Sequence, residues 1–289
     1  MKRRGRRWAG YPFLCIAAAS VTTLGYSSPS QCQVSVGMRA QDFGINAAIG
    51  VATAAAWSIV RGRGLTGALK YGLLGGVTMA AGRQVAASPF NGSGFVGREI
   101  SAAGISLITA SGSDHMTMSF PVGPVRIQVR AGGAVDWRVN ATDAVDVIVN
   151  SVRSQTRLDP GLSLSSGTFV FRDARDTFTT GGETSIEAIG EEELGNIKLA
   201  RDAFYGRGEP RALFHENVHV LQEDYLSEAL ANPIENAILS RLHVSKRIMR
   251  HVDLGLLSSQ VESLANAAIP YSARPWEREA YALTPQHDY

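Results

Sequence analysis

The stretch Ala212–Gln222, ALFHENVHVLQ, holds the residues of this chain whose types and spacing are best suited to chemistry. His215 and His219 are four positions apart, so on a helix both imidazoles lie on one face, one turn from each other. Two imidazoles placed in this way can bind a single Zn²⁺ at about 2.0–2.1 Å each. Glu216 would lie beside the metal, where a carboxylate can take a proton from a bound water and pass it to a leaving group. The spacing therefore predicts zinc-dependent hydrolysis, with Glu216 as general base and then general acid.

The residues around this motif predict that it is buried. The flanking positions are apolar: Leu213, Phe214, Val218, Val220 and Leu221. A buried imidazole or carboxylate is costly without a polar or ionic partner, and a metal ion supplies one. The alternative is a pair of hydrogen-bonded core histidines near a surface glutamate, which would not explain all three polar residues together.

A catalytic zinc site needs a third protein ligand and keeps its fourth position for water. The chain has two cysteines, Cys15 and Cys32, and Cys15 lies in a predicted leader, so we expect a histidine or a carboxylate as the third ligand. The available candidates are Glu235, Glu262, Glu277, Glu279, His243 and His251. The segment RPWEREAYAL is the best placed, because a helix that opens at Pro275 presents Glu277 in its first turn.

The pair of motifs HENVH and EREAY resembles the gluzincins, zinc metallopeptidases whose third ligand is a glutamate on a later helix, within E-x-x-A-D. The resemblance covers about residues 205–285. It implies that Glu277 is the third ligand and that Ala280 is a small packing residue. It places Tyr281 where the family usually has an orienting aspartate, so a tyrosine hydroxyl would have to replace that carboxylate or the site would be weakened. A shift of register by two residues would make Glu279 the ligand instead.

Four other side chains have possible roles near a metal. Gln222 lies one turn beyond His219 and would be able to orient a neighbouring side chain. Tyr225, Tyr281 and His251 are candidates for stabilising an oxyanion. An ordinary solvated position fits Gln222 equally well, and a structural role is favoured for Tyr225, Tyr281 and His251, because no spacing connects them to the metal.

The N-terminus has the pattern of a secretory signal peptide. Five of the 28 basic residues lie within the first seven positions, and an uncharged run from Trp8 to Met38 follows them. Small residues near Ser27 and Ser30 provide cleavage sites, which predicts a signal peptide at residues 1–30 and an exported protein of the periplasm or cell envelope. The basic pI of 8.6 therefore reflects this leader and gives no indication of nucleic-acid binding.

Residues 31–114 form a Gly/Ala-rich region that is expected to be helical. Three stretches lack charged side chains: Phe43–Val60, Tyr71–Gly82 and Ile100–Ser113. Recurrent small residues let helices approach closely, in membranes or in tight bundles. We therefore expect either a buried helical hairpin of a soluble domain or membrane association through residues 43–113.

Residues 115–190 are expected to form a small antiparallel sheet. The segments Val125–Arg130 and Ala134–Asn140 alternate apolar and polar residues around Gly132-Gly133, which is a hairpin signal. Ala144–Val152 fits a strand or a short helix, and Gly167–Asp173 is rich in strand-forming residues. Within it, Thr168–Arg172 is either an interior strand or an edge strand that binds an extended peptide.

Residues 191–289 are expected to be helical. Helices are predicted to open at Glu209 and at Pro275, and helical patterns also cover Ser227–Lys246 and Ser258–Ala268. Together the four regions predict an α+β fold, with a zincin-like helical C-terminal part, a small sheet and a Gly/Ala-rich helical region before it.

The predicted function is that of an exported zinc metallohydrolase that acts on a peptide or protein substrate. His215, His219 and Glu277 would bind the Zn²⁺. One alternative is a membrane-associated structural or pore-forming protein whose zinc site is not catalytic. Another is a metal-binding pseudoenzyme, which the tyrosine at position 281 suggests.

Overall fold

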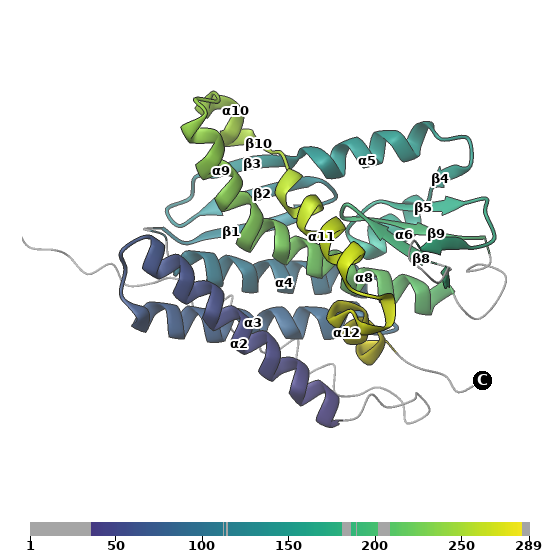
Figure 1. The fold of residues 1–289 in the computed structure, drawn as a ribbon, viewed down its shortest axis with the longest axis horizontal. Helices are drawn as coiled ribbons and strands as arrows, with labels where there is room; N and C mark the ends of the chain where they lie inside the picture. The colour runs from purple at the N-terminus through teal and green to yellow at the C-terminus, as the bar shows by residue number, and fades with distance from the viewer. Residues whose placement is uncertain are drawn as a thin grey trace, which may run out of the picture.

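The computed structural model describes residues 36–111, 113, 115–180, 186–188, 190–201 and 209–284. The predicted signal peptide at residues 1–30 lies outside this part of the chain, as do Cys15 and Cys32. The described residues form an α+β fold, as the sequence predicts (Figure 1).

Three long helices come first: α2 (Val36–Val60), α3 (Leu65–Ala86) and α4 (Ser93–Ala110). They confirm the predicted helical character of the Gly/Ala-rich region. Helices α3 and α4 run side by side, and α2 crosses them obliquely (Figure 1). A Cβ atom added to Gly82 of α3 would lie 2.6 Å from the Gly97 carbonyl oxygen of α4, so the glycines permit the two backbones to touch.

Two small mixed sheets follow. The first has the order β1-β2-β3-β10, with strands β1 (Thr117–Val122), β2 (Val125–Arg130), β3 (Val135–Asn140) and β10 (Val252–Asp253). The second has the order β4-β5-β9-β8, with strands β4 (Thr156–Leu158), β5 (Val170–Asp173), β9 (Asn196–Leu199) and β8 (Gly190–Glu193). A separate hairpin joins β6 (Phe178–Thr180) to β7 (Ile186–Ala188).

The predicted hairpin around Gly132-Gly133 is confirmed, since β2 pairs with β3 in antiparallel fashion and Val129 faces Val135. The prediction of one antiparallel sheet confined to residues 115–190 is wrong. Strand β10 joins β3 in parallel, and β9 joins β5 in parallel. Both parallel partners come from beyond residue 190, in the part predicted to be helical.

The strands β8 and β9 were not predicted, because their residues lack the alternating apolar and polar pattern of a half-buried strand. All four residues of β9 are buried, so the strand shows no alternation of apolar and polar residues. Lys198 of β9 is only 3% exposed, and its ammonium group lies 3.2 Å from the carboxylate of Glu191 on β8. A lysine held by this cross-strand ion pair thus occupies a buried strand position at which an apolar residue would be expected.

Helices α5 (Ala141–Val152) and α6 (Pro160–Ser166) interrupt the sheets. The structure thus settles the ambiguous segment Ala144–Val152 as helix. Asn140 caps α5 by accepting a hydrogen bond from the Thr142 amide, which gives the helix a clear start that the strand alternative lacks.

The C-terminal part is mostly helical, and its helices open at Glu209 and Pro275 as predicted. It contains α8 (Glu209–Tyr225), the π-helical turn η1 (Leu226–Ala231), α9 (Asn232–Arg241), α10 (Lys246–His251), α11 (Leu256–Ala268), the 3-10 turn η2 (Tyr271–Ala273) and α12 (Pro275–Leu283). The segment Ser227–Lys246, for which helical patterns were predicted, is divided, because α9 ends at Arg241 and His243 takes a positive φ of 59°.

Helix α8 lies between the second sheet and the other helices. Val220 and Leu221 pack into one core cluster with buried side chains of β5 and β9, namely Val170, Ile197 and Leu199. Val218 packs with Ala280 and Leu283 of α12. Helix α8 is therefore held from two sides, and α12 is held beside it.

Candidate metal centre

His215, His219 and Glu277 meet between α8 and α12. The two Nε2 atoms of the histidines lie 3.0 Å apart, and each lies 3.3 Å from Oε2 of Glu277. Their side chains are 10%, 11% and 11% exposed, so the cluster is nearly buried. Among the described histidine, cysteine, aspartate and glutamate residues, this is the one group of three whose ligand atoms all lie within 4.8 Å of one another.

The geometry of these three atoms fits one tetrahedral metal ion. Ligand atoms bound to such an ion at about 2.0–2.1 Å lie about 3.3–3.4 Å from one another. The three separations here, 3.0, 3.3 and 3.3 Å, are close to this ligand–ligand distance. Two imidazoles and one carboxylate are also a donor set that zinc accepts, with the fourth position left for a water or a substrate. The three residues could therefore hold one metal ion, and their donor set is compatible with zinc.

Gln222 fixes the orientation of one of these histidines. The Nδ1–H of His219 donates a hydrogen bond to Oε1 of Gln222 over 2.8 Å. With its proton on Nδ1, the ring presents the lone pair of Nε2 to the cluster, which is the form that binds a metal. This hydrogen bond supports the orienting role for Gln222 over the alternative of an ordinary solvated side chain.

The catalytic candidate Glu216 lies against the edge of the second sheet. A Cβ atom added to Gly190, the first residue of β8, would lie 2.7 Å from Oε1 of Glu216. Glycine at position 190 therefore makes the space that the carboxylate occupies. Burial raises the pKa of Glu216, while the charges of His215 and His219 oppose the rise. A carboxyl group with a raised pKa is suited to giving back a proton that it has accepted.

The charges of the cluster depend on one another. Burial by itself would raise the pKa of Glu277, but its hydrogen bonds to His215 and His219 lower that pKa well below its ordinary value. Burial would lower the pKa of His219, but the hydrogen bond to Glu277 and the charge of Glu216 raise it to about 9. In the metal-free protein, a proton on His219 thus supplies the positive charge that the two carboxylates favour.

Two tyrosines border the site. The ring of Tyr281 lies 4.4 Å from the ring of His215, and its hydroxyl is 3.3 Å from that of Tyr271. The Tyr271 hydroxyl in turn donates a hydrogen bond to Glu277. Burial, followed by the hydrogen bond to Tyr281 and the charge of Glu277, raises the pKa of Tyr271, which keeps its hydroxyl protonated and able to donate. Tyr281 therefore packs on a histidine of the cluster.

The other candidates for the third ligand lie elsewhere. Glu279 accepts a hydrogen bond from Gln222 and forms an ion pair with Arg83 of α3. Glu235 accepts a hydrogen bond from the Gly255 amide, and Glu262 interacts with Glu192 and Glu223. His243 is exposed beyond the end of α9. His251 stacks on Trp137 of the first sheet, 4.7 Å between ring centroids.

Tyr225 is also remote from the cluster, since its hydroxyl hydrogen-bonds to Thr53 of α2. Of the three residues considered for oxyanion stabilisation, Tyr281 is the one that the structure places at the histidines. The sequence carries no signal that places Tyr271 or Gly190 at this site. Both reach the site through long-range packing, and neither has a spacing to the motif that would reveal it.

The strand beside the catalytic candidate is β8, at the end of the second sheet in the described part of the chain. Strand β5, which contains most of the segment Thr168–Arg172, is an interior strand paired with β4 and β9. The edge-strand alternative for that segment is therefore wrong, and β8 takes the position beside Glu216 instead.

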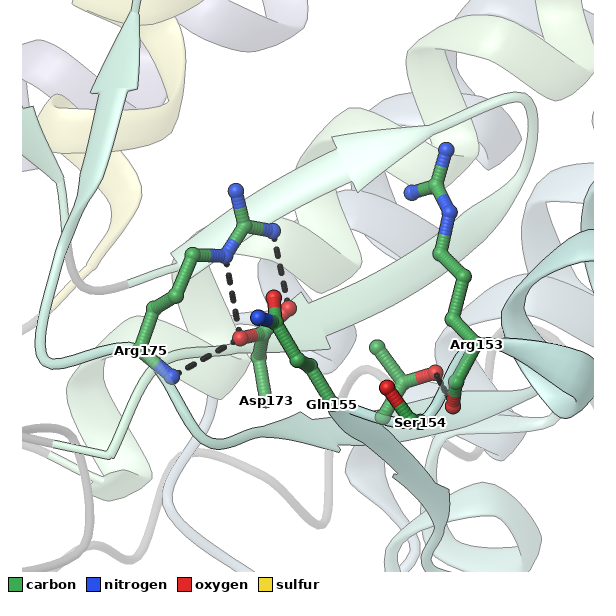
Figure 2. Close-up of a pocket in the computed structure, with 6 residues that line it drawn as sticks. Arg153, Ser154, Gln155, Asp173 and Arg175 are labelled. Carbon is green, nitrogen blue, oxygen red and sulfur yellow. Dashed lines mark hydrogen bonds and ion pairs between the residues drawn. The ribbon is translucent and has the colours of Figure 1, made fainter.

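A hollow of about 480 Å³ lies on the second sheet and includes none of the residues of the metal cluster. Its lining residues are Arg153, Ser154, Gln155, Thr156, Asp173 and Arg175. Figure 2 shows that the Asp173 carboxylate holds the Arg175 guanidinium through two hydrogen bonds, of 3.0 and 2.8 Å. Because one of its two arginines is already neutralised, this hollow is a weaker candidate site than the metal cluster.

Comparisons with known proteins find no matching family model, no matching curated protein and no matching solved structure.

Proposed function

We propose that this protein is a zinc-dependent hydrolase, and that its substrate is a peptide or protein. The observation that carries the proposal is the convergence of His215, His219 and Glu277 at separations of 3.0–3.3 Å, with Glu216 next to them. A Zn²⁺ bound there would polarise a substrate carbonyl and lower the pKa of a water molecule.

The residues of the chain have separate roles in this proposal. His215, His219 and Glu277 hold the ion, and Gln222 keeps His219 in the tautomer that binds it. The carboxylate of Glu216 accepts a proton from the attacking water and delivers it to the leaving amine. The protonated hydroxyl of Tyr271 lies at the cluster through its hydrogen bond to Glu277, and the exposed Tyr281 lies beside it. Because the one proton of the Tyr271 hydroxyl is donated to Glu277, Tyr281 is the hydroxyl placed to donate to an oxyanion.

A peptide substrate is favoured by the position of β8. The free edge of a sheet offers backbone N–H and C=O groups that pair with an extended chain. Gly190, the first residue of this strand, is in contact with Glu216, so a peptide added along β8 would pass the catalytic carboxylate. This arrangement supports peptide-bond hydrolysis over the hydrolysis of a small ester or amide.

The exposed face of the N-terminal helices supports a location at a membrane of the cell envelope. Among the described helices, α2 is the one that is long and apolar enough to cross a membrane, over Ala40–Val60 with a mean hydropathy of 1.6. Its neighbour α3 exposes Leu69 and Leu73, at 57% and 51%. No acidic residue occurs from position 43 to position 98, so anionic lipid would not be repelled. Loss of vesicle binding in a Leu69→Glu/Leu73→Glu variant would support this location, and unchanged binding would refute it.

The hydrolase proposal is tested with Glu216→Gln. The purified wild-type and variant chains, each loaded with zinc, are incubated with a panel of unstructured peptides, and cleavage is followed by mass spectrometry. We expect wild-type cleavage, and a loss of at least about 100-fold in the variant because a general base contributes about 10²–10⁴-fold. Equal zinc contents would show that the variant retains its site.

Two results would remove the proposal. Undiminished cleavage by Glu216→Gln would show that this residue is not the base. No cleavage by a fully zinc-loaded wild-type chain with any peptide would favour a structural zinc site or a pseudoenzyme.

A further inference from the structure

The metal cluster is connected to the N-terminal helices by a chain of partly buried hydrogen bonds. It begins at His219, whose Nδ1–H donates to Oε1 of Gln222 over 2.8 Å. Nε2 of Gln222 then donates to Oε2 of Glu279 over 2.7 Å. Oε1 of Glu279 accepts from Nη1 of Arg83 over 2.7 Å and from Nδ2 of Asn46 over 3.1 Å. The path therefore runs from α8 through α12 to α3 and α2.

The direction of each hydrogen bond is set by the groups on either side of it, and the Trp276 carbonyl, which also accepts from Nε2 of Gln222 over 3.2 Å, favours the same orientation of that amide. A carboxylate paired with an arginine can only accept hydrogen bonds, so the group of Gln222 that faces Glu279 must be its NH₂. The carbonyl oxygen of Gln222 then faces His219, and a carbonyl can only accept. His219 must consequently carry its proton on Nδ1, which leaves Nε2 to bind the metal.

The opposite arrangement would disable the ligand. If the amide of Gln222 were turned over, its NH₂ would point at Nδ1 of His219, and that nitrogen would have to accept. The proton would then be on Nε2, the atom that lies 3.0 Å from His215 Nε2 and 3.3 Å from Glu277. An Nε2–H cannot ligate a metal, so the ring would be in the wrong tautomer.

Arg83 is the residue that completes this chain. Its side chain is 5% exposed, and the same Nη1 atom also donates to Oδ1 of Asn46 over 2.8 Å. Asn46, which is fully buried, donates in turn to Asp42 over 2.7 Å. Arg83 is thus held by Asn46 and Glu279, and it is the cation that pairs with Glu279 in the described part of the chain.

We propose that Arg83 is a positioning residue of the metal centre, which acts on His219 through Glu279 and Gln222. The Gly/Ala-rich helices are therefore part of the site, although they supply no ligand. This inference rests on the proposed zinc site, and it assigns to α2 and α3 a role beyond anchoring or packing.

The test compares two substitutions that each remove an arginine from an ion pair of 2.7 Å. Arg83→Met breaks the pair with Glu279, whereas Arg138→Met breaks the pair with Asp253, which has no connection to the cluster. Zinc affinity is measured for full-length wild-type, Arg83→Met and Arg138→Met chains by competition with a chelator. We expect about a 10-fold loss of affinity for Arg83→Met, the lower end for groups that orient ligands. We expect no loss for Arg138→Met, and partial rescue by Arg83→Lys.

A spectroscopic measurement separates positioning from general destabilisation. In the zinc-loaded wild-type chain, the Nδ1–H proton of His219 should give a slowly exchanging imidazole resonance by NMR. In Arg83→Met this resonance should broaden or disappear, while the resonances of His243 and His251 should not change. Loss of thermal stability alone would not produce this pattern.

The inference would be overturned by wild-type zinc affinity and an intact His219 resonance in Arg83→Met, or by an equal loss in Arg138→Met. Failure of the proposed function has a different signature. A wild-type chain that binds no zinc would remove both proposals. A chain that binds zinc but cleaves no peptide would remove the hydrolase alone and leave the role of Arg83 in place.

Discussion

Helix α8 and the turn η1 that follows it carry two buried charged clusters of opposite character. Near the end of α8, Asp224 is held by Arg98 from α4 at 2.7 and 2.9 Å and also pairs with Arg126 from β2. Glu228 of η1 pairs with the same Arg126 at 2.7 Å. This cluster is neutralised by cations that belong to the chain.

The cluster at His215, Glu216, His219 and Glu277 has no such cation. In the described residues, Glu216 and Glu277 interact with the two histidines, with each other and with Tyr271, and neither forms an ion pair with an arginine or lysine. Its donor atoms also meet at separations that suit one metal ion. One cluster therefore has the composition of a structural ion-pair network, and the other has that of a cation-binding site.

Of the substitutions that distinguish the two clusters, the one at Asp224 should have the largest effect on stability. Asp224→Asn leaves Arg98 and Arg126 buried and underpaired, and loss of one partner from a buried ion pair costs about 3–5 kcal/mol of unfolding free energy. Urea denaturation of the metal-free chain measures this loss. Added zinc should restore none of the deficit relative to the wild-type chain, and full restoration by zinc would show that the two clusters are not independent.

The metal cluster should respond in the opposite way. Glu277→Ala should lower zinc affinity by more than the 10–100-fold typical of residues that orient ligands, because it removes a ligand itself. Above about pH 9, where His219 of the metal-free chain is neutral, the variant should not lose more than about 1 kcal/mol of unfolding free energy, since the lost carboxylate then has no buried cation that depends on it. Chelator competition and urea denaturation measure the two quantities.

Glu235→Ala and Glu262→Ala are matched controls for this experiment, because both remove a glutamate from the same C-terminal part. Neither should alter zinc affinity. A larger loss for either of them than for Glu277→Ala would reassign the third ligand.

A substitution one step further from the metal should have a smaller effect. Gln222→Met keeps the length of the side chain but removes the acceptor for the His219 Nδ1–H. We expect zinc affinity to fall by about 10–100-fold, because the ring would no longer be held in one tautomer. An unchanged affinity, measured by the same competition, would show that the hydrogen bond of 2.8 Å does not orient the ligand.

The smallest single step is the change of zinc affinity with each unit of pH. The pKa of His219 in the metal-free chain is raised to about 9, so below that pH a bound proton must leave before the metal binds. Apparent affinity should therefore rise about 10-fold per pH unit and level off near pH 9, because each unit costs about 1.36 kcal/mol per proton. A plateau that begins near the ordinary histidine pKa of about 6.5 would contradict the described pairing with Glu277.

Local signals in the sequence were enough to place much of this site. The spacing of His215 and His219 predicts a shared helical face, and Pro275 predicts the start of the helix that carries Glu277. Both helices are present, and the structure brings the three residues together. Each of these predictions depends on the conformation of fewer than ten consecutive residues, which is the range in which backbone preferences are readable.

The remaining parts of the site depend on contacts between distant segments. Gly190, Tyr271 and Arg83 reach the cluster only because β8, η2 and α3 pack around α8 and α12. The parallel pairings of β5 with β9 and of β3 with β10 are likewise set by tertiary packing. No periodicity marks them, because β9 is buried on both faces and β10 has only two residues.

The most direct test of the account is the metal content of the purified wild-type chain, compared with that of a His215→Ala/His219→Ala variant after the same dialysis. We predict about one zinc per wild-type chain, as expected for one site with three protein ligands, and almost none in the variant. A wild-type chain that retains no divalent metal, or a double variant that retains as much as the wild type, would contradict the central claim that these histidines and Glu277 form a metal centre.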